Sequence, residues 1–483
     1  MPNGKKNKIF TAATLTVIAC ISLMLHLWRI SYPDRPVFDE VFFASFASDY
    51  IYHEPYLGVH PPFGNLIYAS TIFLTSRDDG ANAQFFNVKK ASGNSYLPIT
   101  YNNLPYHAFP YVSLRIVSAL FGAALPVVFY SFLVSIGVST LGSLIGAGMI
   151  VLENALLLQT RLILIDGMYL VFGFAALIFY VKKYPKPFAA GIFWGLSLGI
   201  KLNAVVFAAP MAIWYVLQRR TRNATASLAK CIITGGLVCL FIMLTTNIFF
   251  SPQQRFDLWY SLGLVPSQST PLLPLLASIP RVSDYVLTSA IETTFSLSGY
   301  VTMKNKSFPL YSSPWYKWLF MKGRITYYGG DTAPAATPAI ILTGNPVIWY
   351  ASTLAVGVVG IMLIWWLVLR IRRSVNKNSR TKTDARENTG IRRPLVLLFG
   401  GYIFSLLPFF TIIHRSTYLY HYFPALIFSI GILAVLISDK LKLDNFDTLT
   451  PCHILLITFM FIPIIFGFVI TAPSTYGFLP LLQ

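Results

Sequence analysis

The most regular feature of the chain is the recurrence of apolar runs, each long enough for a helix, separated by short polar breaks. A helix needs roughly 20 apolar residues to cross a ~30 Å hydrocarbon layer, and only helices or closed barrels pair all their backbone groups in lipid. The pattern therefore predicts an all-α polytopic membrane protein with about 11 transmembrane helices, near residues 9–30, 111–133, 134–153, 161–181, 187–201, 203–217, 229–250, 345–370, 394–412, 419–437 and 452–472.

The stretch 187–217 is too long for one ordinary span and short for two. The basic segments "KKYPK" before it and "QRRTR" after it both indicate the cytoplasmic side, so the chain must cross outward and return. We therefore predict two short helices that meet at Lys201 and Asn203.

Composition supports a membrane protein, since 55% of the residues are hydrophobic and only 11% are charged, against about 25% charged in soluble domains. A net charge of +19 also occurs in nucleic-acid-binding proteins. Here, however, Lys and Arg gather in short breaks between apolar runs, which is the positive-inside pattern of membrane proteins. We predict no nucleic-acid partner.

The distribution of basic residues predicts the orientation. With 11 spans the N-terminus is cytoplasmic and the C-terminus lies outside, and the short inner breaks then hold 21 of the 37 Lys and Arg. The basic start "NGKKNK" is followed by an apolar run longer than that of a cleavable signal peptide, which indicates an uncleaved first span.

The long polar segments fall on the outer side and divide the chain. We predict an N-terminal catalytic module (1–250) that includes an outer loop (31–110), a second outer loop (251–343), and a C-terminal four-helix module (344–483) with a basic cytoplasmic linker (370–393). Both outer loops are expected to contain amphipathic helices. Ionisable residues massed at one membrane face favour an enzyme over a transporter, which would bury them near the midplane.

The cysteines indicate neither a disulfide framework nor a metal site. Cys20, Cys231, Cys239 and Cys452 lie in or beside apolar runs without metal-ligand spacing. We predict that they are small core residues, and that the protein uses no metal and no cofactor.

One short motif stands out in the first outer loop, where "FDEVFF" places Asp39 beside Glu40 between large hydrophobic residues, and "HPPFGN" follows at 60–65. This order resembles the protein O-mannosyltransferase family. Six further segments resemble it in the family's order: "LRIVSALFGAALP", "QTRLILIDGMYLVF", "GLSLGIKLNAVVF", "SSPWYKWLFMKGRITYY", "GNPVIWY" and "YLYHYFPALIF".

The resemblance implies a GT-C type glycosyltransferase fold. It also implies transfer of a hexose, typically mannose, from a polyprenyl-phosphate carrier to Ser or Thr hydroxyls of exported proteins, with inversion at the sugar carbon. Residues 251–343 leave no room for the β-trefoil domain of eukaryotic members, which resembles the prokaryotic branch and implies a plasma membrane. Asn65 stands where the family motif usually has Lys. Eukaryotic relatives pair into dimers, so an oligomer is also implied.

An acceptor hydroxyl must lose a proton as it attacks the sugar, and a carboxylate can accept it. Within the resemblance we expect Asp39 to be this general base. Glu40 cannot share its face on a helix or strand, so we expect it to orient a cation or the acceptor. The structural alternative is that the pair caps a helix beginning at Val41.

The leaving phosphate needs cations at the membrane face. Arg115 and Lys201 are the main candidates. Arg115 lies at the outer end of the second predicted span, and Lys201 is an intramembrane Lys, which is costly without a partner. The remaining donor-phosphate candidates are Arg161, Arg324 and Arg415. Each of these three arginines is equally explained as a residue that snorkels to the outer face, and snorkelling is also the structural alternative for Lys201.

Four further residues are candidates for the acceptor or sugar site: His60, Asp166, His421 and Tyr422. Each has a structural alternative, namely loop ordering by His60, a helix-packing hydrogen bond from Asp166, and an aromatic belt formed by His421 and Tyr422.

Two rival functions remain open on the sequence. An enzyme of the same architecture can use a lipid or cell-wall glycan acceptor, as the aminoarabinose transferases of lipid A do. A flippase of lipid-linked sugars is the rival from another class, and it would not need Asp39 for turnover.

Overall fold

The computed structural model describes residues 2–53, 56, 58, 60–75, 105–106, 108–218, 222–251, 312–329, 339–375, 389–411 and 417–478. Helices dominate these residues, as predicted. The N-terminal half contains α1 (Pro2–Leu27), α2 (Glu40–Ile51), α3 (Phe63–Thr75), α5 (Tyr111–Ser135), α6 (Thr140–Val151), α7 (Asn154–Arg161), α8 (Asp166–Val181), α9 (Pro187–Leu198), η3 (Leu202–Phe207), α10 (Ala208–Leu217) and α11 (Arg222–Phe249).

The C-terminal half adds a short helix and two strands before its long helices. Its elements are α15 (Trp315–Trp318), β1 (Ile325–Tyr328), β2 (Ile340–Leu342), α16 (Pro346–Val375), α18 (Thr389–Thr411), η5 (Leu419–Tyr422), α19 (Phe423–Lys440), η6 (Phe446–Thr448) and α20 (Pro451–Tyr476). The pair β1–β2 is antiparallel and was not part of the all-α prediction.

Seven helices in the described part of the chain are long and apolar enough to span a membrane, or eight if α6 and α7 form one span bent by 63°. Four shorter apolar helical segments accompany them: Phe63–Thr75, Asp166–Val181, Pro187–Leu198 and Leu202–Leu217. The membrane architecture is thus confirmed, but the count of 11 is not. The predicted break in 187–217 is confirmed, because α9 ends at Leu198 and Lys201 is extended (φ −150°, ψ 125°) before η3.

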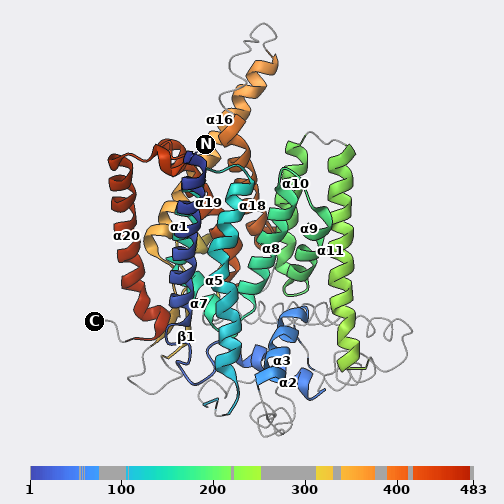
Figure 1. Ribbon diagram of the computed structural model, residues 1–483. Helices are drawn as coiled ribbons and strands as arrows, with labels where there is room; N and C mark the ends of the chain where they lie inside the picture. The colour runs from blue at the N-terminus through green and yellow to red at the C-terminus, as the bar shows by residue number, and fades with distance from the viewer. Residues whose placement is uncertain are drawn as a thin grey trace, which may run out of the picture.

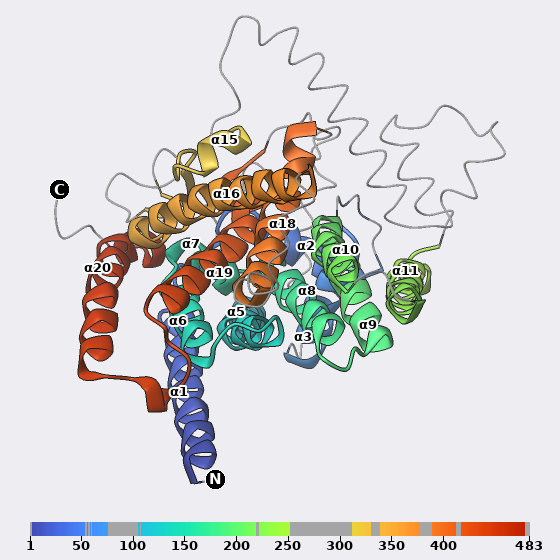
Figure 2. The same cartoon turned by 90° about the horizontal axis from the view of Figure 1, so that it is seen from above.

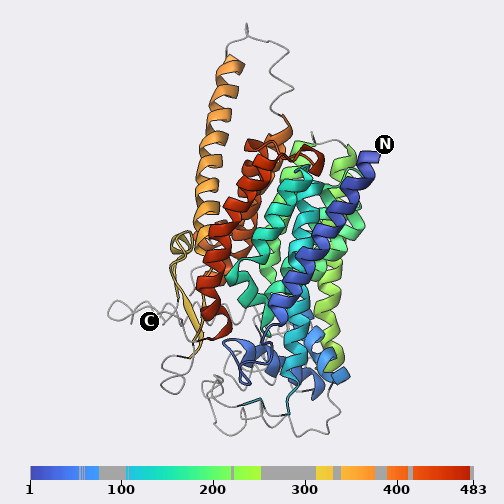
Figure 3. The same cartoon turned by 60° about the vertical axis from the view of Figure 1, so that its left-hand side comes forward.

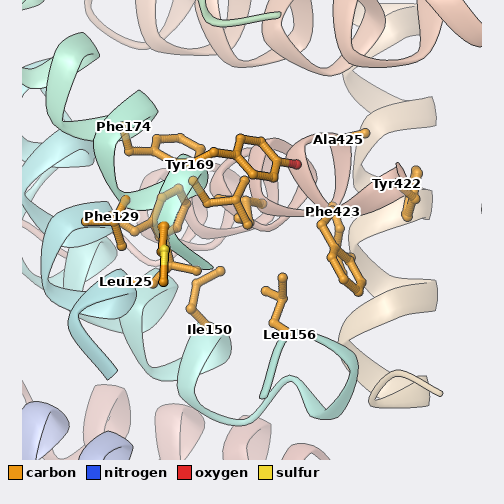
Figure 4. Close-up of a cluster of buried hydrophobic side chains, with 14 of the residues drawn as sticks. Leu125, Phe129, Ile150, Leu156, Tyr169, Phe174, Tyr422, Phe423 and Ala425 are labelled. Atoms are coloured by element: carbon orange, nitrogen blue, oxygen red, sulfur yellow. The ribbon is translucent and has the colours of Figure 1, made fainter. Parts of the chain in front are cut away.

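The helices form one bundle with α19 near its centre, packed against α6, α16 and α18 (Figure 2). Figure 4 shows part of the core, where side chains from α5, α6, α7, α8 and α19 meet. The rings of Phe174, Phe207 and Phe428 interlock there, with Phe174 5.2 Å from Phe207 and 5.3 Å from Phe428. Gly173 makes this approach possible, since a Cβ at that position would lie 2.0 Å from the Phe207 ring.

The two ends of the bundle differ. Helix α1 begins at the end where α10 leads toward α11, whereas α2, α3 and β1 lie at the opposite end (Figure 1). Figure 3 shows α16 extending beyond its neighbours at the first of these ends. The two short helices from the first predicted outer loop therefore lie together, away from the start of α1. Residues 252–311 of the second predicted outer loop lie outside the described residues.

Candidate active site

Asp39 and Glu40 lie side by side at the start of α2 but have different surroundings. The side chain of Glu40 is completely buried and accepts five hydrogen bonds. Two come from Arg115, at 2.8 Å to Oε1 and 2.7 Å to Oε2. The others come from the backbone N–H groups of Ile163 and Val37, each at 2.9 Å, and from the hydroxyl of Tyr106 at 3.2 Å.

The guanidinium of Arg115 is equally enclosed. Besides its two bonds to Glu40, it donates to the carbonyl oxygens of Ile30, Pro33 and Arg35 at 2.8–3.1 Å. These five bonds match the five N–H groups of a guanidinium, and the side chain has no exposed surface. Arg115 is therefore not placed to hold a donor phosphate, contrary to our expectation. It instead fixes the loop after α1 against α5 through these carbonyl groups, with Glu40 as its counter-ion.

Asp39 occupies the N-cap position of α2, yet its side chain makes no capping hydrogen bond. The helix-capping alternative therefore does not explain this carboxylate. The side chain is half-buried and lies in the loop between α1 and α5, outside the spanning helices. Burial raises the pKa of Asp39 to about 7, while the nearby charge of Lys201 lowers it and that of Asp166 raises it. A carboxylate with a pKa near neutral pH is suited to act as a general base.

Lys201 and Asp166 form a buried ion pair near Asp39. The Nζ of Lys201 lies 2.8 Å from Oδ1 of Asp166, and both side chains are about 95% buried. The ammonium also lies 5.5 Å from the ring centre of Tyr169 and 5.3 Å from that of Tyr420. Lys201 lies at the break between α9 and η3, where its side chain is buried. The partner that we expect for an intramembrane Lys is here the carboxylate of Asp166.

Two further polar side chains, Gln159 and Tyr327, join this group, and neither was among the predicted site residues. The Nε2 of Gln159, in α7, donates to Oδ2 of Asp166 at 2.9 Å, and the hydroxyl of Tyr327, in β1, donates to Oε1 of Gln159. Both residues lie inside segments that carry the family resemblance. Only the structure shows that they meet.

The remaining acceptor-site candidates have unequal positions. His60 is half-buried and its ring stacks on Phe43 of α2, with 6.1 Å between ring centres. His421 is buried, its Nδ1 accepts from the Tyr418 N–H at 3.1 Å, and it closes the capping box of η5. It thereby orders the turn that carries Tyr420.

Tyr422 does not line a site. Its side chain is fully buried in the core view of Figure 4, and its ring lies 5.3 Å from that of Trp349. The expectation that it binds acceptor or sugar was wrong, because the turn η5 directs Tyr422 into the helix bundle.

The other expected phosphate ligands that the structure describes, Arg161 and Arg324, lie elsewhere. Arg161 is buried, donates to the carbonyl oxygen of Trp28 and lies 4.5 Å from the ring centre of Tyr476. Arg324 is exposed just before β1, and Arg415 lies outside the described residues. The structure thus groups Lys201 and Asp166 with Asp39, but does not add Arg161 or Arg324.

An apolar groove of about 600 Å³ runs along α10 beside α18. It begins at Val205, in the helical turn that follows Lys201. The described residues that line it are all apolar, namely Val205, Ala208, Ala209, Ala212, Ile213, Val216, Leu217, Val396 and Phe404. Among the described residues no cluster of three or more His, Cys, Asp or Glu is arranged to hold a metal ion.

Two family models match the chain. One, described as dolichyl-phosphate-mannose-protein mannosyltransferase, matches residues 16–250. The other, described as the C-terminal four TMM region of protein-O-mannosyltransferase, matches residues 298–481. Together they include every residue of the polar group described above.

Curated relatives match the chain over about half of its length or less. Dolichyl-phosphate-mannose–protein mannosyltransferase 1 of Saccharomyces cerevisiae is 31% identical over 233 residues, 44% of this chain and 27% of the relative. Mannosyltransferase 4 of Candida albicans is 29% identical over 199 residues (40% and 24%), and human protein O-mannosyl-transferase 1 is 28% identical over 238 residues (45% and 30%). The matches thus span about a quarter of these relatives.

Solved structures show the same fold. The S. cerevisiae protein O-mannosyltransferase Pmt1-Pmt2 complex bound to the sugar donor superposes with a TM-score of 0.71 at 15% identity, over 98% of this chain and 90% of that one. The archaeal oligosaccharyltransferase AglB from Archaeoglobus fulgidus gives 0.52 at 14% identity, over 99% and 57%. The predicted GT-C fold is therefore confirmed.

Proposed function

Because this chain belongs to the protein O-mannosyltransferase family, we propose that it transfers mannose from a polyprenyl-phosphate carrier to Ser or Thr hydroxyls of exported proteins. The observation that carries the proposal is the pairing of two features at one site. Asp39 offers a carboxylate that makes no capping hydrogen bond to α2, and the Lys201–Asp166 pair places a cation near it.

Asp39 is the general base in this proposal. As the acceptor oxygen forms its bond to the anomeric carbon, its proton passes to the carboxylate of Asp39. The bond between that carbon and the phosphate oxygen breaks on the opposite face of the sugar, so the configuration inverts. General-base help of this kind contributes roughly 10²–10⁴ to the rate.

Lys201 is the donor-phosphate ligand in the proposal. Its ammonium already lies against one carboxylate oxygen of Asp166 and two tyrosine rings, so it is held in place before the phosphate arrives. A fixed cation in a buried site stabilises charge on a leaving group more strongly than a mobile one in water. Asp166 thus positions Lys201 in this account.

The groove along α10 fits the isoprenoid tail of the carrier. It begins in the turn after Lys201, and the side chains that the structure describes along it are apolar. A carrier whose phosphate meets Lys201 can therefore place its first isoprene units against Val205 and Ala208 and the rest along α10.

We also propose that the site faces the outside of a plasma membrane, with the N-terminus in the cytoplasm. The basic segment 182–186 between α8 and α9, the end of α10 and the start of α11 lie on the side where α1 begins, opposite α2 and α3 (Figure 1). The positive-inside pattern makes that side cytoplasmic. The yeast structure is a complex, and an oligomer of this chain is a proposal that cross-linking in membranes tests.

The experiment uses membranes containing the full chain and a radiolabelled polyprenyl-phosphate mannose. Label is followed into protein and into lipid, for the native chain, Asp39→Asn and the control Asp34→Asn, whose carboxylate is exposed in the same loop. The proposal expects label in protein with the native chain and the control, and a loss of at least ~100-fold with Asp39→Asn. Label in lipid alone, or full transfer by Asp39→Asn, would overturn it.

A further inference from the structure

The residue before Asp39 has an unusual backbone conformation. Phe38 has a φ of +55°, in the left-handed region that non-glycine residues rarely adopt. Such a conformation persists only where the surrounding structure fixes it, and it often occurs at functional sites. Because Phe38 and Asp39 share a peptide unit, whatever holds Phe38 also determines where the carboxylate of Asp39 points.

Tyr327 holds Phe38 by two contacts. Their rings stack almost in parallel, with 4.2 Å between centres and 2° between planes. The N–H of Phe38 donates to the carbonyl oxygen of Tyr327 at 3.1 Å. Tyr420 adds an edge contact, with its ring centre 6.0 Å from that of Phe38.

Tyr327 is itself displaced from a regular strand. In the β1–β2 pair, Thr326 faces Ile341 and Tyr328 faces Ile340, so the register shifts at Tyr327. A bulge of this kind turns one residue away from the ladder and re-aims it. At this bulge the carbonyl oxygen of Tyr327 accepts the hydrogen bond from the N–H of Phe38. The hydroxyl of Tyr327 donates to Gln159, which in turn donates to Asp166.

We propose that Tyr327 is a positioning residue that sets the proposed base and the proposed phosphate ligand relative to each other. Its ring and carbonyl group hold the backbone at Asp39, and its hydroxyl reaches Asp166 and Lys201 through Gln159. The inference rests on the proposed function of Asp39 and Lys201 and extends it to the segment between α15 and α16. A displacement of about 1 Å in a reacting group costs on the order of 10²-fold in rate.

The test measures kcat and the KM for the donor in membranes or nanodiscs, with a peptide acceptor at saturation. Tyr327→Leu is expected to lower kcat by ~10- to 100-fold and to leave the donor KM within about threefold. Tyr327→Phe keeps the ring that stacks on Phe38 and loses only the hydroxyl, so it is expected to recover kcat to within about fivefold of the native chain. Tyr328→Leu, the same change one residue along the strand, is the matched control and is expected to keep native kcat.

A second variant guards against misfolding. Phe38→Leu removes the other ring of the stack, so it is expected to lower kcat as Tyr327→Leu does, and the double variant is expected to be no slower than either single one. If Tyr327→Leu does not accumulate in the membrane, the kcat of Phe38→Leu alone tests the positioning role.

The inference would be overturned by native kcat in Tyr327→Leu or Phe38→Leu, by equal losses in Tyr327→Leu and Tyr328→Leu, or by additive losses in the double variant. Its failure differs from that of the proposed function. An active Asp39→Asn enzyme refutes the base itself, whereas an inactive Asp39→Asn with a fully active Tyr327→Leu refutes only the positioning role.

Discussion

The two neighbouring carboxylates should respond in opposite ways to the same change, the replacement of one oxygen by an amide nitrogen. Glu40→Gln is expected to destabilise the fold. Asp39→Asn is expected to leave the fold intact and to abolish transfer. The structural basis is that Glu40 is a hub of the loop after α1, whereas the side chain of Asp39 makes no capping bond.

The size of the first effect follows from the partners of Glu40. Its carboxylate accepts from Arg115 twice, from two backbone N–H groups and from Tyr106. Gln leaves Arg115 buried without a counter-ion and turns an NH2 group toward donors. Breaking a buried pair by removing one partner costs about 3–5 kcal/mol. Asp39→Asn loses no capping hydrogen bond, so we expect a change of at most about 1 kcal/mol.

The assay is thermal unfolding of the purified full chain in one detergent, followed by intrinsic fluorescence and by protection of a buried thiol. Cys231 is a suitable reporter because it is buried. The Glu40→Gln variant should have a melting temperature well below that of the native chain. The Asp39→Asn variant should melt at nearly the same temperature as the native chain. Equal melting temperatures for the two variants would refute the assignment of Glu40 to structure.

Three further predictions follow from the same contacts. Lys201→Met should raise the donor KM by ~10- to 100-fold, with Lys201→Arg intermediate, because the phosphate loses a charge-assisted bond; donor titration measures this, and an unchanged KM would contradict it. Activity should rise with pH through about 7 as Asp39 loses its proton. The pH–rate profile of Asp166→Asn should shift to lower pH, because removing the negative charge of Asp166 lowers the pKa of Asp39. A shift to higher pH would show that the titrating group is not Asp39. Gly173→Ala should lower the free energy of unfolding by about 1–3 kcal/mol, because its methyl group would lie 2.0 Å from Phe207, whereas Gly236→Ala, with nothing within 4 Å of its Cβ, is the control that should melt like the native chain.

The membrane architecture could be predicted from the sequence because hydropathy and charge act locally. Each apolar run predicts a helix independently of the rest of the chain. The basic flanks of 187–217 were enough to predict the break near Lys201. The number of spans could not be fixed in the same way. Helices α6 and α7 meet at a 63° bend, and the chain pattern across 134–161 does not show whether such a bend interrupts a span.

The site was predicted less completely, for a physical reason. Lys201 could be predicted as a site residue because a charge within an apolar segment requires a partner. The sequence did not indicate that Asp166 is that partner. Arg115 was misassigned because its counter-ion, Glu40, lies 75 positions away. Gln159 and Tyr327 carry no charge and meet only across 168 positions, so spacing gave no signal for them.

The central claim is that Asp39 takes part in the reaction and not in donor binding. The most direct measurement compares the donor Kd with the single-turnover rate of transfer for the native chain and Asp39→Asn, in nanodiscs at pH 8. The account predicts a Kd within about threefold of native and a rate at least ~100-fold lower. A native rate, or a lost rate explained entirely by lost donor binding, would contradict it.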